Sequence, residues 1–182
     1  MKLLIKKTTA VMVTTLALLL VSGCAGLCRM DGPYEGRVVD GETKQPLEGV
    51  VVLAVWYKYY PNVAGSSSEF YDSVELRTDK KGEFKIPGKG LLLFSHLDEA
   101  DLIIFKAGYG EFGFEPWSSF KTRTGRKFVR WDGDIPTFLM QKLSYEERKH
   151  HIITRTGIDL NRQQLLTDEI HKERIEFSHE PQ

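Results

Sequence analysis

The chain has 182 residues, of which 25 are basic and 25 are acidic, so its formal net charge at neutral pH is zero. This balance excludes the basic excess that marks proteins that bind nucleic acid. Hydrophobic residues make up 41% of the chain, and the length is sufficient for one domain with a sizeable core of its own.

The N-terminal segment has the three-part layout of a secretory signal. Lys2, Lys6 and Lys7 provide a positive start, and Thr8–Val21 is uncharged and mostly apolar. A membrane-spanning helix is the alternative, because the uncharged stretch continues as far as Cys28 and is long enough to cross a bilayer. Threonines and glycines dilute this stretch and leave only a short apolar core, which favours the signal.

The segment ends in Val21-Ser22-Gly23-Cys24, which resembles the lipobox of bacterial lipoproteins. The resemblance implies that the chain is cut before Cys24, which then carries a thioether diacylglycerol and an acylated (for example palmitoylated) amine. Two or more such chains hold a protein firmly at a membrane. Ala25 stands where many lipoproteins of the inner membrane have aspartate. We therefore expect a lipid anchor in the cell envelope that faces the periplasm, with the outer membrane favoured.

Cleavage at this site would divide the chain into four parts. Residues 1–23 are the predicted signal peptide, 24–32 the lipidated tether, 33–143 a β-sandwich and 144–182 a helical extension. Removal of the signal with its three lysines leaves 159 residues, with 22 basic and 25 acidic side chains. Cys28 is then the only free thiol, so an internal disulfide is impossible. We expect this thiol to be incidental, and pairing between molecules is the alternative.

Short segments with alternating or β-branched residues follow the tether, separated by turn signals. Polar turns are expected at 40–46 and 79–82, the second ending in Gly82, and a loop is expected at 62–70. No segment with helical periodicity lies among them, which predicts a mostly β fold in the form of an antiparallel sandwich. The predicted strands are Tyr34–Val39, Gly49–Tyr60, Ser73–Thr78, Glu83–Ile86, Ala100–Tyr109 and Pro136–Leu143.

Three sequence blocks in this region are similar to the carboxypeptidase regulatory-like domain. They are Gly36-x-Val38-x-Asp40-x-x-Thr43-x-x-Pro46-Leu47-x-Gly49-Val50-x-Val52, Thr78-Asp79-x-x-Gly82-x-Phe84-x-Ile86 and Lys106-x-Gly108-Tyr109. The resemblance implies a seven-stranded, transthyretin-like (prealbumin-like) β-sandwich, which usually serves as a non-catalytic accessory for folding, spacing or binding. The chain departs from the family in the long loop after the second strand, in the bulky segment 88–99 and in a long insertion after Tyr109.

The pattern changes to a helical period after Leu143. Ser144 with Glu147 three residues later is a capping-box pattern, and Leu166 and Ile170 have helical spacing within a highly charged segment. We predict one or two short helices, separated near Gly157. They would either cover an edge or face of the sheet or dock a partner.

Residues of types that bind metals or catalyse reactions are present, but their spacing argues against an enzyme. His96 and Glu99 match the His-x-x-Glu pair of zinc carboxypeptidases, yet a catalytic zinc needs a third ligand and an open site. His150 and His151 are adjacent on a predicted helix and point to different faces, so with His171 they are expected to be solvated. We predict no metal and no cofactor.

Nucleophile motifs give no support for an enzyme either. The sequence contains no Gly-x-Ser-x-Gly, and no cysteine is placed as a nucleophile beside a histidine. Transthyretin-like folds include 5-hydroxyisourate hydrolase, whose chain ends in Tyr-Arg-Gly-Ser, whereas residues 179–182 of this chain are His-Glu-Pro-Gln.

The insertion at 109–136 is the best candidate for a binding surface, because aromatic and basic side chains alternate along it. Aromatic rings stack on sugars, and cations add anion or cation–π contacts. Alternatively, the aromatics fold inward as a satellite core, and Trp56–Tyr60 presents the same two alternatives. The candidate binding residues are Tyr109, Trp117, Arg123, Arg126 and Trp131.

Taken together, the patterns indicate a non-catalytic, membrane-anchored envelope lipoprotein. Its β-sandwich would serve as a structural or protein-interaction module for an envelope protein whose identity the sequence leaves open. The alternative is a module that binds a glycan or another small ligand through 109–136.

Overall fold

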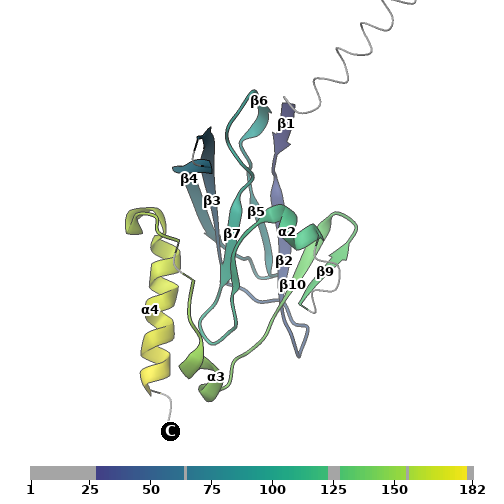
Figure 1. Ribbon diagram of the computed structural model, residues 1–182. Helices are drawn as coiled ribbons and strands as arrows, with labels where there is room; N and C mark the ends of the chain where they lie inside the picture. The colour runs from purple at the N-terminus through teal and green to yellow at the C-terminus, as the bar shows by residue number, and fades with distance from the viewer. Residues whose placement is uncertain (1–27, 64, 123–127, 155, 180–182) are drawn as a thin grey trace, which may run out of the picture. The chain divides into compact units, whose positions relative to one another are not determined.

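The structure is a computed structural model that describes residues 28–179 except 64, 123–127 and 155 (Figure 1). The predicted signal peptide and Cys24 lie outside the described residues. The chain divides into two compact units. The described part of the first contains residues 28–31 and 89–95, and that of the second contains residues 32–88 and 96–179 with the gaps given above.

The first unit is a two-stranded antiparallel ribbon. Strand β1 (Cys28–Asp31) pairs with β6 (Gly90–Leu93), so that Cys28 lies opposite Leu93 and Asp31 lies opposite Gly90. The predicted tether at 24–32 therefore contains a short strand, and the segment 88–99 contributes its partner.

The second unit contains two four-stranded sheets, which confirms the prediction of a mostly β, sandwich-like fold. The first sheet has the order β5-β2-β10-β9 and the second has the order β4-β3-β7-β8. The strands of the first sheet are β2 (Tyr34–Asp40), β5 (Glu83–Ile86), β9 (Val129–Asp132) and β10 (Ile135–Met140). Those of the second are β3 (Val51–Asn62), β4 (Gly65–Arg77), β7 (Asp101–Phe105) and β8 (Phe112–Pro116).

The strand pairing differs from a seven-stranded antiparallel arrangement. The two sheets contain eight strands, and β2 pairs with β10 in parallel, with Val38 opposite Phe138. Parallel neighbours need a long connection, and here the segment of the chain that connects β2 to β10 contains the other strands of both sheets. Alternation of apolar and polar residues identifies a strand but not its direction, so the sequence pattern could not reveal this pairing.

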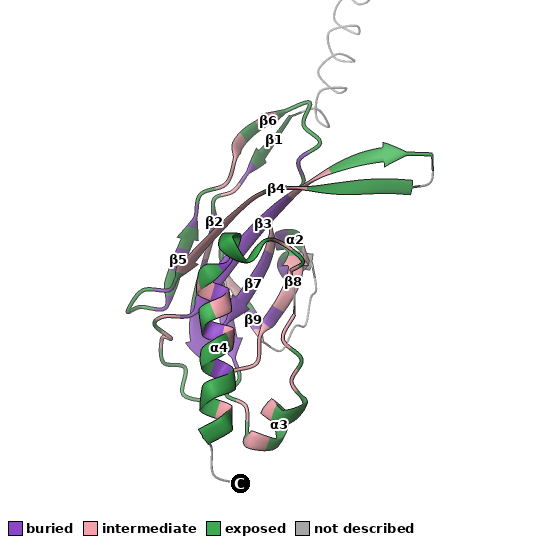
Figure 2. Cartoon of the chain, turned by 90° about the vertical axis from the view of Figure 1, so that its left-hand side faces the viewer, coloured by how far each residue is buried: buried purple, intermediate pink, exposed green. Residues whose placement is uncertain are grey.

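The predicted loop at 62–70 is wrong. Strands β3 and β4 form a long hairpin that pairs as far as Asn62 opposite Gly65. The outer part of this hairpin is exposed on both strands, as Figure 2 shows in green. Its serine-rich sequence is polar, as is usual for an exposed segment of either kind. Polarity alone therefore does not distinguish an exposed hairpin from a loop.

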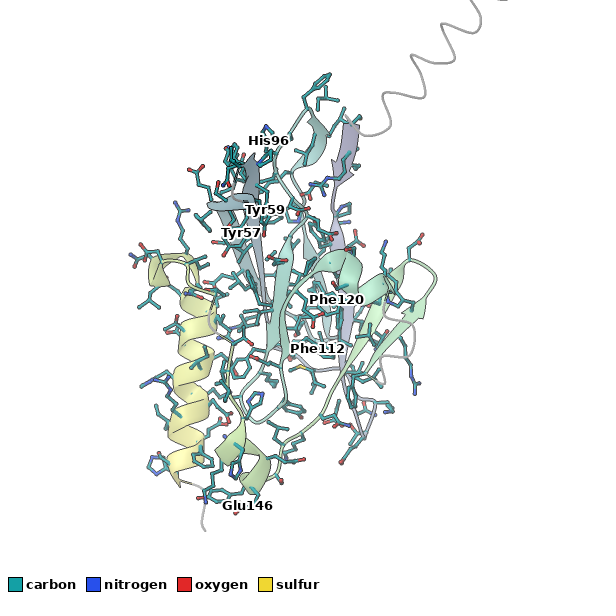
Figure 3. The ribbon with its side chains drawn as sticks, viewed as in Figure 1. Tyr57, Tyr59, His96, Phe112, Phe120 and Glu146 are labelled. Atoms are coloured by element: carbon teal, nitrogen blue, oxygen red, sulfur yellow. The ribbon has the colours of Figure 1, made fainter. Side chains whose placement is uncertain are left out.

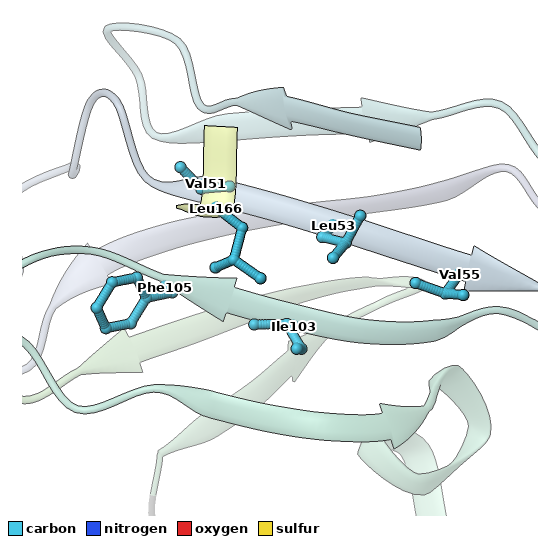
Figure 4. Packing of buried hydrophobic residues seen from close by; sticks show 6 residues of the cluster. All are labelled: Val51, Leu53, Val55, Ile103, Phe105 and Leu166. Carbon is cyan, nitrogen blue, oxygen red and sulfur yellow. The ribbon is translucent and has the colours of Figure 1, made fainter. Parts of the chain in front are cut away.

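The inner half of β3 is buried on both faces, which explains its unbroken apolar run. Val51, Leu53 and Val55 contact Ile103 and Phe105 of β7, and Leu166 of the C-terminal helix joins this cluster (Figure 4). On the other face, Trp56 contacts Tyr34 of the opposing sheet edge to face, with ring centroids 6.0 Å apart. The sheet that contains β3 thus lies between the other sheet and a helix.

The C-terminal region contains helices, as expected. The capping box between Ser144 and Glu147 is present at the start of α3 (Tyr145–His150). A 3-10 turn at Leu160–Arg162 precedes α4 (Gln164–His179), which is longer than the short helix predicted and packs against β3 and β4 (Figures 1 and 2). Within the described part of the chain, none of the helices has both the length and the apolar character that crossing a bilayer requires.

Candidate functional site

The outer half of the β3–β4 hairpin is the most prominent exposed surface that carries aromatic residues. We call residues 57–72 the hairpin surface. Tyr59, Tyr60, Val63 and Tyr71 are all exposed there. Figure 3 shows Tyr57 and Tyr59 along this hairpin, with His96 beside it. Exposed tyrosines on paired strands form a firm, amphipathic surface of the kind that binding sites use.

Specific contacts order the side chains of the hairpin surface. A β-bulge lies between the pairs Trp56–Asp72 and Tyr57–Phe70, so Tyr71 has no residue opposite it. The ammonium group of Lys58 lies 4.5 Å from the centre of the Tyr71 ring, a cation–π contact. Tyr57 instead packs edge to face on Phe70 of the paired strand, with centroids 6.3 Å apart, and on Phe114 of β8, with centroids 6.1 Å apart; the second contact anchors the hairpin to the sheet.

A second segment extends the sheet beside the hairpin and brings carboxylates to it. The Tyr59 amide donates to the His96 carbonyl over 2.9 Å, and the Asp98 amide donates to the Tyr57 carbonyl over 3.0 Å. Burial raises the pKa of Asp101 to about 6, and the negative charges of Asp98 and Glu99 add to this rise. Burial, followed by the charge of Asp101, also raises the pKa of Tyr57 and that of Tyr59. Burial is thus the main cause of these shifts, and the carboxylates of Asp98, Glu99 and Asp101 add negative charge near the base of the hairpin surface.

The two members of the His-x-x-Glu pair have separate contacts. The His96 ring lies against Tyr60, with ring centroids 5.2 Å apart. Glu99 accepts hydrogen bonds from the backbone amide of Ser118 over 3.2 Å and from its hydroxyl. Among the described residues, no three histidine, cysteine, aspartate or glutamate side chains gather in an arrangement that could hold a metal ion.

The candidate residues of the insertion are in part directed inward. Trp117 is only 9% exposed, and its ring contacts those of Tyr34, Trp131 and Phe138. It lies in α2 (Trp117–Thr122), whose Phe120 is also buried; Figure 3 shows Phe120 together with Phe112. The inward-folding alternative therefore describes Trp117, whose side chain is buried among other aromatic rings.

The remaining candidates of the insertion have different positions. The Tyr109 hydroxyl donates to Asp40 Oδ2 over 3.1 Å and so holds two turns together. Trp131 is half-buried, and its indole nitrogen donates to the Phe120 carbonyl over 2.9 Å. Arg123 and Arg126 lie outside the described residues. The structure brings Trp117 and Trp131 together but does not bring Tyr109 to them.

The insertion also lines a pocket of about 410 Å³. Its apolar walls include Phe112, Phe128, Leu139 and Leu143, and its polar lining residues are Glu111, Glu115 and Gln141. One carboxylate oxygen of Glu111 accepts a hydrogen bond from the Thr154 amide over 2.9 Å. The other oxygen is buried and has no hydrogen-bond partner among the described residues. Glu111, Glu115 and Gln141 supply hydrogen-bond acceptors among the apolar walls, which favours a ligand that carries a hydrogen-bond donor.

Comparison of this chain with protein-family models, with curated proteins and with solved structures finds no match. The candidate sites therefore rest on their own geometry. Sequence reasoning noted the aromatic run Trp56–Tyr60 but missed the hairpin, because the residues after Tyr60 show no alternation of apolar and polar side chains.

Proposed function

We propose that this protein is a non-catalytic lipoprotein, anchored in the envelope through Cys24, whose β-sandwich holds another envelope protein at the hairpin surface. The observation that carries the proposal is the β3–β4 hairpin, which continues beyond the strand pairing of β7 and exposes three tyrosines. Tyrosine is enriched at protein interfaces because it supplies large contact area and a polar tip.

Strand β4 adds a second means of contact, because it is the edge strand of its sheet. An extended segment of a partner can add to such an edge through backbone hydrogen bonds, while side chains provide specificity. The strand carries Glu69 and Asp72, whereas Asp98, Glu99 and Asp101 lie on the other side of β3, away from this edge. The charge at this surface therefore favours a partner segment with basic side chains.

For the finer fold, we propose a variant of the transthyretin-like, carboxypeptidase regulatory-like sandwich. The conformations of the motif residues support it. Asp40 accepts the backbone amides of Glu42 and Thr43 over 2.9 and 2.8 Å, and Gly82 has a positive φ of 73°. The eighth strand of the sheets would then come from the insertion, and the parallel pair would involve β10 at the end of the insertion.

The anchor is tested by replacing each cysteine separately. Cys24→Ala should abolish labelling by a fatty-acid probe and block maturation, because lipid attachment needs this thiol. Cys28→Ala is the control and should leave labelling unchanged. Continued labelling of the Cys24→Ala chain would contradict the anchor, whatever the hairpin surface binds.

The interaction surface is tested by capture of partners from envelope extracts with the anchor intact. Replacing Tyr59 and Tyr71 with alanine should greatly reduce the recovery of any partner, while the melting temperature barely changes because both rings are exposed. Ile135→Ala, which changes an exposed apolar residue of the other sheet, serves as the control. Equal recovery with all three proteins would argue against the hairpin surface.

A small-ligand module is the second candidate function, favoured by the pocket beside the insertion. A screen of glycans and small amines should then find a ligand whose binding weakens in Glu111→Gln and in Phe128→Ala. Trp131→Ala changes an insertion residue outside the lining of this pocket and tests whether another part of the insertion binds the ligand. Ligands that bind all variants equally would exclude the pocket.

A further inference from the structure

One face of the ribbon of β1 and β6 is apolar, and the other carries its charged side chains together with Leu92. Residues directly opposite each other in an antiparallel pair share a face, which places Cys28, Met30, Leu91 and Leu93 together. Met30 is 65% exposed, and Leu91 and Leu93 are 58% and 57% exposed. We call these four residues, with Phe94, the ribbon face. Three large apolar side chains thus lie side by side in water on a ribbon only four residues long.

The opposite face of the ribbon satisfies its own charges. Asp31 is buried, and its carboxylate lies 3.6 Å from the Arg29 guanidinium and accepts the Lys89 amide over 2.8 Å. The described part of this unit contains no other acidic residue, so two basic side chains outnumber one buried carboxylate. The ribbon therefore presents no exposed negative charge to an anionic surface.

Phe94 directly follows Leu93 at one end of the ribbon. Its ring is 75% exposed, and its backbone has a positive φ of 51°, which is unusual for a bulky residue. Because Leu93 pairs with Cys28, Phe94 follows at the end of the ribbon where the chain arrives from Cys24. The exposed Phe94 side chain is thus next to the segment that joins the ribbon to the predicted lipid.

The length of that segment limits how far the ribbon can lie from a membrane. Four residues lead from Cys24 to Cys28 and can span at most about 14 Å. Amphipathic segments at a membrane surface bury their apolar side about 5–10 Å deep, at the level of the headgroups. A ribbon tied this closely to embedded acyl chains is within reach of that layer.

We propose that the ribbon face, made of Met30, Leu91, Leu93 and Phe94 around Cys28, lies in the headgroup region of the bilayer that holds the lipid anchor. The inference rests on the lipidation of Cys24 proposed above. The contact would restrict rotation about the short tether and so orient the protein relative to the membrane. A lipid surface is favoured over a protein partner because the anchor keeps it at high local concentration beside the ribbon.

Cys28 offers a direct test, because it lies on the ribbon face and is the only free thiol once Cys24 carries lipid. The mature lipoprotein would be labelled there with an environment-sensitive fluorophore and reconstituted in vesicles of phosphatidylethanolamine and phosphatidylglycerol. We expect blue-shifted emission, strong quenching by lipids with a nitroxide near the headgroup and weak quenching by aqueous iodide. Leu91→Ser with Leu93→Ser should reverse all three effects, whereas the matched control Leu92→Ser, on the other face, should retain them.

The outcomes separate this inference from the anchor on which it rests, because the intact mass reports the lipid independently. The lipidated chain in vesicles is compared with the Leu91→Ser/Leu93→Ser variant. Equal access of iodide to the probe in the two proteins would overturn the membrane contact alone. A chain of unmodified mass would overturn the anchor and this inference with it. A probe shielded in native membranes but open to iodide in pure lipid vesicles would assign the ribbon face to a protein partner and overturn the lipid contact.

Discussion

Single residues at the turns decide how the two sheets join. Gly82 has a positive φ of 73°, and its carbonyl accepts the Val38 amide over 2.8 Å. A Cβ atom added to Gly82 would lie 2.3 Å from the Val38 carbonyl oxygen. Asp79 holds the same turn by accepting the Lys81 and Glu83 amides, each over 2.8 Å. The predicted turn at 79–82 is thus present, and the clash with Val38 adds a cost that the sequence could not reveal.

Replacing Gly82 with valine should therefore destabilise the protein more than the same change at Gly133. Gly133 also has a positive φ, 63°, but no atom lies near the position of its added Cβ. Backbone strain costs about 1–3 kcal/mol at either position. Only Gly82→Val must also move the backbone at Val38. Urea unfolding of both variants measures the difference, and equal unfolding midpoints would show that the turn relaxes freely.

At the scale of elements, α4 is fixed to the sandwich by buried charges. Glu169 and Glu173 are only 2% and 8% exposed. Glu169 accepts the Arg77 guanidinium over 2.6 Å and the Ala107 amide over 3.1 Å. Glu173 accepts the Arg148 guanidinium over 2.8 Å, and also a backbone amide of the turn after β7. The helix thus completes hydrogen bonds that the sheet leaves open.

Removal of one partner of the buried Arg148–Glu173 pair should be costly. Arg148→Ala is expected to reduce the free energy of unfolding by about 3 kcal/mol, since it leaves the Glu173 charge buried. Adding Glu173→Gln should recover part of that loss. Lys85→Ala, which breaks the exposed pair with Glu35, is the control and should cost at most about 1 kcal/mol. A double-mutant cycle by chemical denaturation checks this, and strict additivity would mean that the two charges do not interact.

An element could be predicted from the sequence where the residues that determine it lie close together in the chain. Strand β5 (Glu83–Ile86) has the predicted bounds because its alternation and its turn lie within a few residues. The sequence predicts helices that cover the sheet or dock a partner, but it does not predict which charges of α4 are buried. Their hydrogen-bond partners are distant in the chain: Arg77 and Ala107 lie 92 and 62 residues before Glu169, and Arg148 lies 25 residues before Glu173. The hairpin surface depends on the bulge at Tyr71, which arises from cross-strand pairing and has no sequence signal. The sequence alone allows Trp117 to be either exposed for binding or folded inward, because its burial depends on residues of the opposing sheet that are distant in the chain.

For the whole molecule, carboxylates of opposite behaviour determine how stability depends on pH. The amide of Thr43 is the main cause that holds the pKa of Asp40 below its usual value. Burial alone would raise the pKa of Glu169, but the hydrogen bonds of Arg77 and Ala107 outweigh it and lower the pKa. Both groups stabilise the fold above the pKa of the unfolded chain, and this contribution is lost as pH falls through their folded pKa values. The pKa of Asp101 is raised in the folded chain, so its effect on stability has the opposite dependence on pH.

Asp101 should make the protein less stable as pH rises from about 4 to about 6. Its pKa is raised from 3.8 to about 6, so in this interval the folded chain binds a proton that the unfolded chain has released. Above pH 6 the full penalty is present; since the side chain is half-buried and partly screened by solvent, we expect about 1–2 kcal/mol. Asp101→Asn should therefore stabilise the protein at pH 7 and have little effect below pH 4. Thermal unfolding across this range tests the expectation, with Asp134→Asn in an exposed turn as the control. A difference between Asp101→Asn and the natural chain that does not vary with pH would show that the Asp101 carboxyl titrates as it does in water.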